Sequence, residues 1–166
     1  MITTEQHTAS SAGTDWLASA YSKPCFALWQ WAGPDGIADI PAGRLFDILR
    51  VTRQSGEHAL KELRSSGAAI GPVLLCSPRV TVEFLVPPGT AAEWAPLPRT
   101  TCVGTGSTLR CPTAYVVPPA AYSGRTWLIP PTGDGILTSP DLLRALIEVQ
   151  RRPYAAVASD EAGPPG

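Results

Sequence analysis

The feature that most restricts the fold of this chain is its content of proline and glycine. Its 166 residues include 18 prolines and 15 glycines. Proline removes a backbone donor and fixes its own φ angle, and glycine adopts the turn conformations that other residues avoid. We therefore expect short helices and strands joined by many turns, and this composition argues against a helical bundle.

The length fits one domain, and a hydrophobic content of 44% is enough to fill a core. The 13 basic and 14 acidic residues nearly balance, so a nucleic-acid contact would need a local basic patch. No apolar run approaches the ~20 residues of a membrane span, and the first residues lack the pattern of a signal peptide. We therefore expect a cytoplasmic protein with no membrane partner.

The spacing of apolar residues predicts helices and strands in alternation. The segment 80–86 alternates cleanly, with Val82 and Phe84 on one side and Glu83 on the other, as a half-buried strand does. Strands are expected over 25–31, 45–51, 72–76 and 80–86, and in shorter pieces over 101–103, 108–111, 114–117 and 125–129. Helices are expected over 16–21, from 52 or 55 to 66, for one turn at 90–94, and from 139 to 150.

This order of elements predicts an α+β fold, in which a mixed and mostly antiparallel sheet is covered by helices on one side. We expect a single domain over residues 16–150. Residues 1–15 and 151–166 are rich in small and polar side chains, and we expect them to form disordered tails.

The cysteines and histidines do not suggest a metal or nucleophile site. Cys25, Cys76, Cys102 and Cys111 include no C-x-x-C spacing, and such cysteines are expected to be reduced and mostly buried. The two histidines, at positions 7 and 58, are too few for a zinc site built with these cysteines or for a catalytic triad.

Arginine outnumbers lysine by 11 to 2 among the basic residues. The planar guanidinium fork suits phosphate oxygens, so the arginines are candidates for a nucleic-acid-binding surface. A high-GC coding bias would produce the same excess without any function. The candidates that we single out are Arg44, Arg50, Arg53 and Arg79.

Asp47 and Glu83 are candidate metal ligands, because each lies on a predicted strand. If the apolar neighbours of both residues point into one core, the two carboxylates share a face and could hold one Mg²⁺ ion weakly. The alternative for Asp47 is a structural carboxylate that caps or pairs near the sheet edge, for example with Arg50 or Arg53. The alternative for Glu83 is the solvent face of a half-buried strand.

Residues 40–150 also carry a series of short motifs in a fixed order. They are 41–47 (PAGRLFD), Ala59-Leu60 with Leu63, 71–73 (GPV), 84–91 (FLVPPGTA), 102–106 (CVGTG), 117–119 (VPP) and 124–128 (GRTWL). In this order and spacing, the motifs resemble the second half of actinobacterial bifunctional DNA primase/polymerase-like proteins, which relate to the archaeo-eukaryotic primase superfamily. The family's longer members carry an N-terminal segment that is shortened here.

The resemblance includes a departure from the catalytic pattern. Polymerising members of the superfamily have an Asp-x-Asp pair on one strand, a histidine on a following strand and a further acid. Such acids hold the two divalent cations that phosphoryl transfer requires. Here Asp47 matches the first acid, Leu49 stands in place of the second, and the strand with Glu83 has no histidine. The resemblance therefore implies a scaffold with an eroded catalytic set, and we assign no catalytic residue.

Three functions follow from these observations. The leading one is a non-catalytic primase/polymerase-like domain that acts as a regulatory module and binds nucleic acid, a nucleotide or a protein. The second is a weakly active, metal-dependent nucleotidyltransferase or primase that uses Asp47, Glu83 and a further acid that the sequence does not identify. The third is a protein-interaction component without a ligand. We expect no cofactor other than a weakly held Mg²⁺ ion, and the sequence indicates no oligomeric state.

Overall fold

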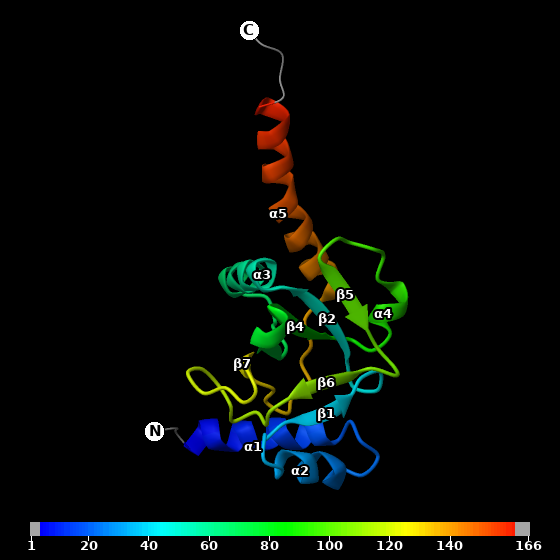
Figure 1. Ribbon diagram of the computed structural model, residues 1–166, viewed down its shortest axis with the longest axis vertical. Helices are drawn as coiled ribbons and strands as arrows, with labels where there is room; N and C mark the ends of the chain where they lie inside the picture. Colours follow the sequence, from blue (N-terminus) through cyan, green and yellow to red (C-terminus); the bar gives the residue numbers. More distant parts are fainter. Residues whose placement is uncertain (1–3, 162–166) are drawn as a thin grey trace.

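Residues 4–161 are described by a computed structural model of the protein, with side chains described for residues 4–150. The fold is α+β, as expected (Figure 1). The helices of these residues are α1 (Thr4–Ala18), α2 (Cys25–Trp31), α3 (Arg53–Ser66), the 3-10 turn η1 (Ser77–Arg79), α4 (Thr90–Glu93) and α5 (Pro140–Glu161). The strands are β1 (Ala38–Pro41), β2 (Asp47–Thr52), β3 (Val73–Cys76), β4 (Thr81–Val86), β5 (Thr100–Val103), β6 (Thr108–Cys111) and β7 (Arg125–Ile129).

All strand pairings within the described sheets are antiparallel. The larger sheet has the order β5-β2-β4-β3-β7, and β1 pairs with β6 in a separate two-stranded sheet. The central pair, β2 and β4, runs from Asp47 opposite Val86 to Thr52 opposite Thr81. β5 and β7 are therefore the edge strands of the larger sheet.

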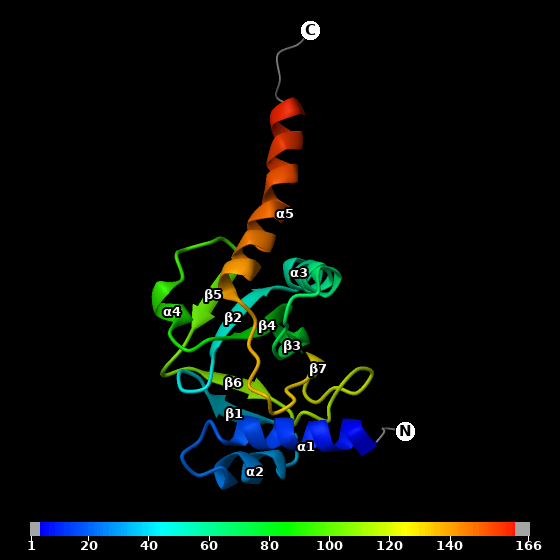
Figure 2. The ribbon, with the colours of Figure 1, turned by 180° about the vertical axis from the view of Figure 1, so that it is seen from behind.

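The two faces of the larger sheet are covered differently (Figures 1 and 2). One face packs against α3 and α5, and the core between them includes Leu49, Phe84, Leu63 and Leu143. The opposite face packs on the β1–β6 sheet, and α1 and α2 pack against that side of the molecule. The one-sided helical cover that the sequence predicts is provided by α3 and α5, while α1 and α2 form a further layer.

The helix α3 forms where the sequence predicts it, because its pattern is strong. Buried residues recur at helical spacing from Gly56 to Leu63, and Gly67 ends the helix with a φ of 73°. Gly56 also lets α3 approach the sheet closely. A Cβ atom at this position would lie 2.5 Å from the Cβ of Val82.

Most other predicted elements are confirmed within two residues at each end. The expected strands over 45–51, 72–76, 80–86, 101–103, 108–111 and 125–129 correspond to β2, β3, β4, β5, β6 and β7, and the expected turn at 90–94 is α4. The start of α5 at Pro140 is also confirmed. There the Ser139 hydroxyl accepts a hydrogen bond from the backbone N–H of Leu142 at 3.3 Å, as an N-cap does.

The strand expected over residues 25–31 is wrong, because this segment is the helix α2. The run has no β-branched residue, and Pro24 occupies the N-cap position. Its buried side chains, Ala27 and Trp31, are four residues apart. The indole Nε1–H of Trp31 donates to the carbonyl oxygen of Cys111 at 3.0 Å, which holds α2 against the small sheet.

The expected disordered tail over residues 1–15 is corrected from Thr4 onward, because these residues form most of α1. Small side chains allow the polar helix to dock closely. Gly13 is buried against the carbonyl of Pro131, and the Thr14 hydroxyl accepts a hydrogen bond from the backbone N–H of Ala114 at 3.1 Å. Composition alone does not reveal this contact, which joins residues 100 positions apart in the sequence.

Two further expectations are corrected. Residues 114–117 form a turn followed by irregular chain instead of a strand, although the carbonyl of Val116 accepts a hydrogen bond from the backbone N–H of Trp127 at 2.9 Å and so covers the edge of β7. At the other end, α5 continues to Glu161, so residues 151–161 of the expected disordered tail are helical. The remaining positions of the two expected tails, 1–3 and 162–166, lie outside the described residues. Among the helices that the structure describes, none combines the length and apolar character needed to cross a membrane.

The docking of α1 is testable with Gly13→Ala. A Cβ atom at this position would lie 1.9 Å from the carbonyl oxygen of Pro131, so α1 or the loop must move. The better helix propensity of alanine is outweighed, and we expect a loss of about 1–3 kcal/mol in the free energy of unfolding, measured in urea. The control is Ser11→Ala on the exposed side of α1, expected to change stability by less than about 0.5 kcal/mol. Equal stabilities of the two variants would contradict the docking.

Candidate functional site

Asp47 is the first residue of β2, and its carboxylate accepts hydrogen bonds from the turn between β4 and α4. The residue is only 2% exposed. Its Oδ2 atom accepts hydrogen bonds from the backbone N–H groups of Gly89 and Ala91, at 3.0 and 2.9 Å. These residues lie at the start of α4, so the carboxylate ties the turn after β4 back to β2. Of the alternatives predicted for Asp47, this geometry corresponds to the capping role.

The remaining space around the Asp47 carboxylate is narrow. A Cβ atom at Gly104 would lie 2.9 Å from Oδ1, and this buried oxygen has no hydrogen-bond partner among the described residues. Burial, together with the charge of Asp47, raises the pKa of the nearby Cys102 thiol to about 11. Cys102 is therefore protonated at neutral pH and is not an anionic ligand beside Asp47.

Glu83 has a different environment, opposite Arg50 in the β2–β4 register. The Arg50 Nε and Glu83 Oε1 atoms are 3.0 Å apart, and Glu83 is 4% exposed. Burial raises the pKa of Glu83 above the ordinary value of 4.5, while Arg50 offsets part of this effect and Arg79 and Arg125 offset less. Glu83 is thus a buried, paired carboxylate instead of a solvent-facing one.

The structure does not bring Asp47 and Glu83 together. Side chains alternate between the faces of a strand, and the register places Asp47 with Leu49 on the face toward α3 and α5. Glu83 lies with Arg50 on the opposite face, toward the β1–β6 sheet, where its charge also acts on Cys111. Among residues 4–150, whose side chains are described, no group of three or more histidine, cysteine, aspartate or glutamate residues is arranged to hold a metal ion.

Four arginines gather where β2 ends and β4 and β7 begin, and we call Arg50, Arg53, Arg79 and Arg125 the arginine end. The backbone N–H of Arg53 donates to the carbonyl of Val80 at 2.9 Å, which places α3 beside η1 and Arg79. Arg50 and Arg125 both act on the buried Glu83, which lies between them on the inner face of the sheet. The arginine end therefore continues from the surface into the space between the two sheets.

The carboxylates near the arginine end are fewer than the arginines. Arg50 pairs with Glu83 at 3.0 Å, and Arg53 pairs with Glu57 at 2.9 Å. No ion pair within 4.0 Å involves Arg79 or Arg125 in the part of the chain with described side chains. Two of the four guanidinium charges therefore lack a direct carboxylate partner, although the whole chain has a formal charge of −1.

Of the four arginines predicted from the sequence, three belong to this cluster. Arg44 does not, because it lies before β2 in a turn closed by a hydrogen bond from Gly43 N–H to the carbonyl of Phe46. Arg125 is not among the four arginines singled out from the sequence, although its position after the turn at Ser123 and Gly124, at the start of a predicted strand, is a usable signal.

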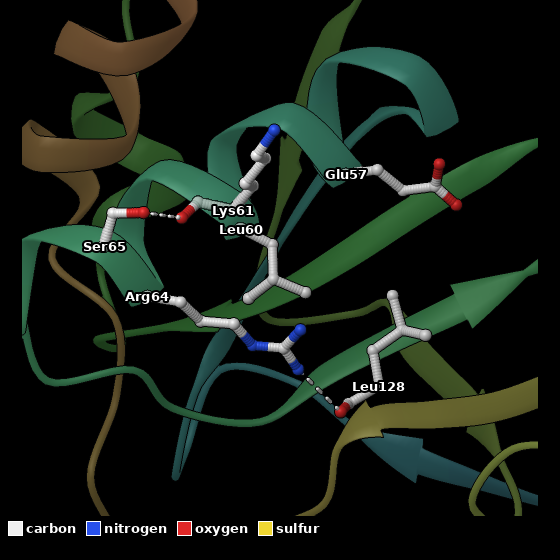
Figure 3. A pocket seen from close by; sticks show the side chains of 6 residues that line it. All are labelled: Glu57, Leu60, Lys61, Arg64, Ser65 and Leu128. Atoms are coloured by element: carbon white, nitrogen blue, oxygen red, sulfur yellow. Dashed lines mark hydrogen bonds between the residues drawn. The ribbon is translucent and has the colours of Figure 1, made fainter.

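A second feature is a shallow pocket of about 350 Å³ between α3 and β7 (Figure 3). Its lining residues are Glu57, Leu60, Lys61, Arg64, Ser65 and Leu128. The guanidinium of Arg64 reaches toward β7, where Nη2 and the carbonyl oxygen of Leu128 are 3.5 Å apart. This pocket is on the α3 face, whereas Glu83 is on the inner face of the sheet.

Comparisons of this chain with family models, with curated proteins and with solved structures found no match. The chemistry of the arginine end is that of an anion site, because guanidinium groups donate paired hydrogen bonds to phosphate or carboxylate oxygens.

The structural role of Asp47 is testable with Asp47→Ala. This change leaves the N–H groups of Gly89 and Ala91 without their acceptor, and we expect a loss of about 1–3 kcal/mol in the free energy of unfolding. Asp47→Asn keeps an acceptor oxygen and is expected to lose less. Urea unfolding followed by circular dichroism measures both, with Asp141→Asn in the first turn of α5 as the control. A loss below about 0.5 kcal/mol for Asp47→Ala would contradict the capping role.

The raised pKa of Glu83 predicts a pH dependence of stability. The folded chain holds the proton of Glu83 more tightly than the unfolded chain does. The resulting stabilisation is complete below the ordinary pKa of 4.5 and is lost as pH rises through the higher folded value. Glu83→Gln cannot ionise, so we expect the stability of this variant relative to the unmodified chain to increase as pH rises through that window.

Urea titrations between about pH 4 and about pH 8 measure this difference. Glu57→Gln is the matched control, because it removes a carboxylate that is exposed and paired with the exposed Arg53. A difference that stays constant, or that changes in the opposite direction, would argue against burial as the dominant effect on Glu83.

Proposed function

We propose that this chain is a non-catalytic, nucleic-acid-binding module on a primase/polymerase-like scaffold. In this proposal the exposed Arg53 and Arg79 contact the phosphate backbone, and the more buried Arg50 and Arg125 add positive charge behind them. The observation that carries it is the convergence of Arg50, Arg53, Arg79 and Arg125 at one end of the sheet, where Glu57 and Glu83 are their only paired carboxylates among the described side chains. A local excess of guanidinium groups supplies the sequence-independent part of nucleic-acid affinity.

The buried pair of Arg50 and Glu83 supports a fixed geometry for this site. Glu83 accepts from Nε of Arg50, and Nη2 of the same guanidinium donates to the carbonyl of Thr108 at 3.3 Å. An arginine held at two atoms loses less side-chain entropy when it meets a phosphate. Arg79, which has no carboxylate partner among the described side chains, supplies a charge on the outside.

The non-catalytic part of the proposal is supported by the surroundings of Asp47. Its Oδ2 atom is occupied by two backbone donors, and Leu49, at the position of a second acid, is fully buried. Glu83 lies on the opposite face of the sheet. A weakly active nucleotidyltransferase would have only Oδ1 of Asp47 free for a metal ion, and this atom is buried in the narrow space beside Gly104.

A protein-interaction function is the second candidate, and one observation favours it. The side chains of Phe26 and Trp29 on α2 are 40% and 66% exposed, and their rings contact each other at a centroid distance of 5.6 Å. Exposed aromatic pairs are common at protein interfaces. We also propose a cytoplasmic location, because all four cysteines are unpaired, as in reducing compartments.

The proposal is tested by fluorescence anisotropy with labelled DNA oligonucleotides at salt concentrations from about 50 to about 200 mM. We expect binding that weakens steeply with salt. Arg79→Gln and Arg53→Gln should each weaken it several-fold and reduce the slope of log K against log salt by about 0.7–1. Arg44→Gln is the matched control, because Arg44 lies outside the arginine end, and it should leave binding unchanged.

Absence of binding at the lowest salt, or an equal effect of Arg44→Gln, would overturn the nucleic-acid proposal. The non-catalytic part is tested separately by nucleotide incorporation with Mg²⁺ or Mn²⁺, where we expect no turnover. Turnover that disappears in Asp47→Asn would instead identify an enzyme.

A further inference from the structure

The pocket between α3 and β7 forms beside an irregularity in the sheet. Along the β3–β7 pair, Val73 faces Ile129 and Leu74 faces Trp127, so Leu128 has no partner residue on β3. Such a bulge changes the direction of side chains and leaves a residue outside the ladder. The carbonyl of Leu128 is instead near the guanidinium of Arg64, as Figure 3 shows.

The apolar part of this pocket comes from Leu60 and Leu128. Leu60 is 4% exposed and belongs to the core beneath α3, and Leu128 is partly buried at the edge of the same core. α3 packs closely on β2 and β4, where Gly56 meets Val82, whereas β7 lies at the edge of the sheet. A shallow apolar floor therefore remains between the second half of the helix and the edge strand.

The charges around this floor are unbalanced. Glu57 is paired with Arg53 at 2.9 Å and points away from Arg64 along the helix (Figure 3). Neither Lys61 nor Arg64 forms an ion pair with any side chain that the structure describes. The single contact from the Arg64 side chain to Leu128 is long, at 3.5 Å, and leaves most of the guanidinium donors available.

We propose that this pocket binds a small organic anion with a short apolar body. The carboxylate or phosphate head is held by Arg64, with Lys61 at the rim, and the body lies on Leu60 and Leu128. A volume of about 350 Å³ is near the lower end for ligand pockets and fits a molecule of few atoms. The site is separate from the arginine end, so it does not depend on the proposed nucleic-acid function.

The test uses three probes that separate the head from the body. Sodium hexanoate has both parts, 1-hexanol has the body without the charge, and inorganic phosphate has a charged head without the body. Each is titrated into the ¹⁵N-labelled full chain while the amide signals of Leu60, Arg64 and Leu128 are followed. We expect saturable shifts with hexanoate, at a dissociation constant on the order of 1 mM, and at least about fivefold weaker binding of the other two probes.

Arg64→Gln should weaken hexanoate binding about fivefold or more, while Arg44→Gln should leave it unchanged. Lys61→Gln, an exposed change at the rim, provides a second variant if Arg64→Gln fails to fold. If 1-hexanol binds as tightly as hexanoate, the pocket recognises only the apolar body of the ligand, and the proposal is overturned. The same follows if no probe saturates or if neither Arg64→Gln nor Lys61→Gln weakens binding, because Arg64 would then only complement the carboxyl end of α3.

Discussion

The register of β2 against β4 determines on which face of the sheet the side chains of Asp47, Arg50 and Glu83 lie. In this pair, the side chains of two partner residues lie on the same face of the sheet. If β2 slipped by one residue against β4, each of its side chains would move to the opposite face. Both faces are buried, one under α3 and α5 and the other under the β1–β6 sheet, so both cores hold the register. The register separates Asp47 from Glu83, and it also places Arg50 opposite Glu83, which allows a carboxylate to remain in the core.

The sequence predicts the central elements because their patterns are local. The apolar residues over 80–86 repeat at every second position, which is the period of a strand, and this segment forms β4. The apolar residues from Gly56 to Leu63 repeat at helical spacing, and this segment forms α3. The apolar and aromatic residues over 25–31 are compatible with a strand and with a helix, so their pattern does not decide between the two. The choice depends on contacts that sequence spacing does not reveal, including the bond from Trp31 to the carbonyl of Cys111, 80 positions away. The polar α1 is likewise stabilised by distant contacts at Gly13.

The sequence indicates which residue types could form the candidate site, but it does not indicate which of these residues lie together. Arg44 and Arg50 are equally plausible as phosphate ligands in the sequence, yet only Arg50 reaches the arginine end, through a pairing across 33 positions. The pairing of Asp47 with Arg50 or Arg53, one of the alternatives considered, is not formed, because these arginines bond to Glu83 and Glu57. The capping role of Asp47 depends on the turn at Gly89, which lies 42 positions away in the sequence. Local patterns could not predict this contact.

Three short sequence motifs, 41–47, 84–91 and 102–106, meet in space around Asp47. The 84–91 motif supplies the two backbone donors, and the 102–106 motif supplies Gly104, where a side chain would meet the carboxylate. The 84–91 motif therefore ties the turn after β4 to Asp47, and Gly104 leaves room for the carboxylate. A second acid in place of Leu49 would be fully buried on the same face, and an unpaired buried carboxylate is costly. Leu49 instead contributes about 1.5–3 kcal/mol of apolar burial beneath α3 and α5, so this position of β2 stabilises the fold.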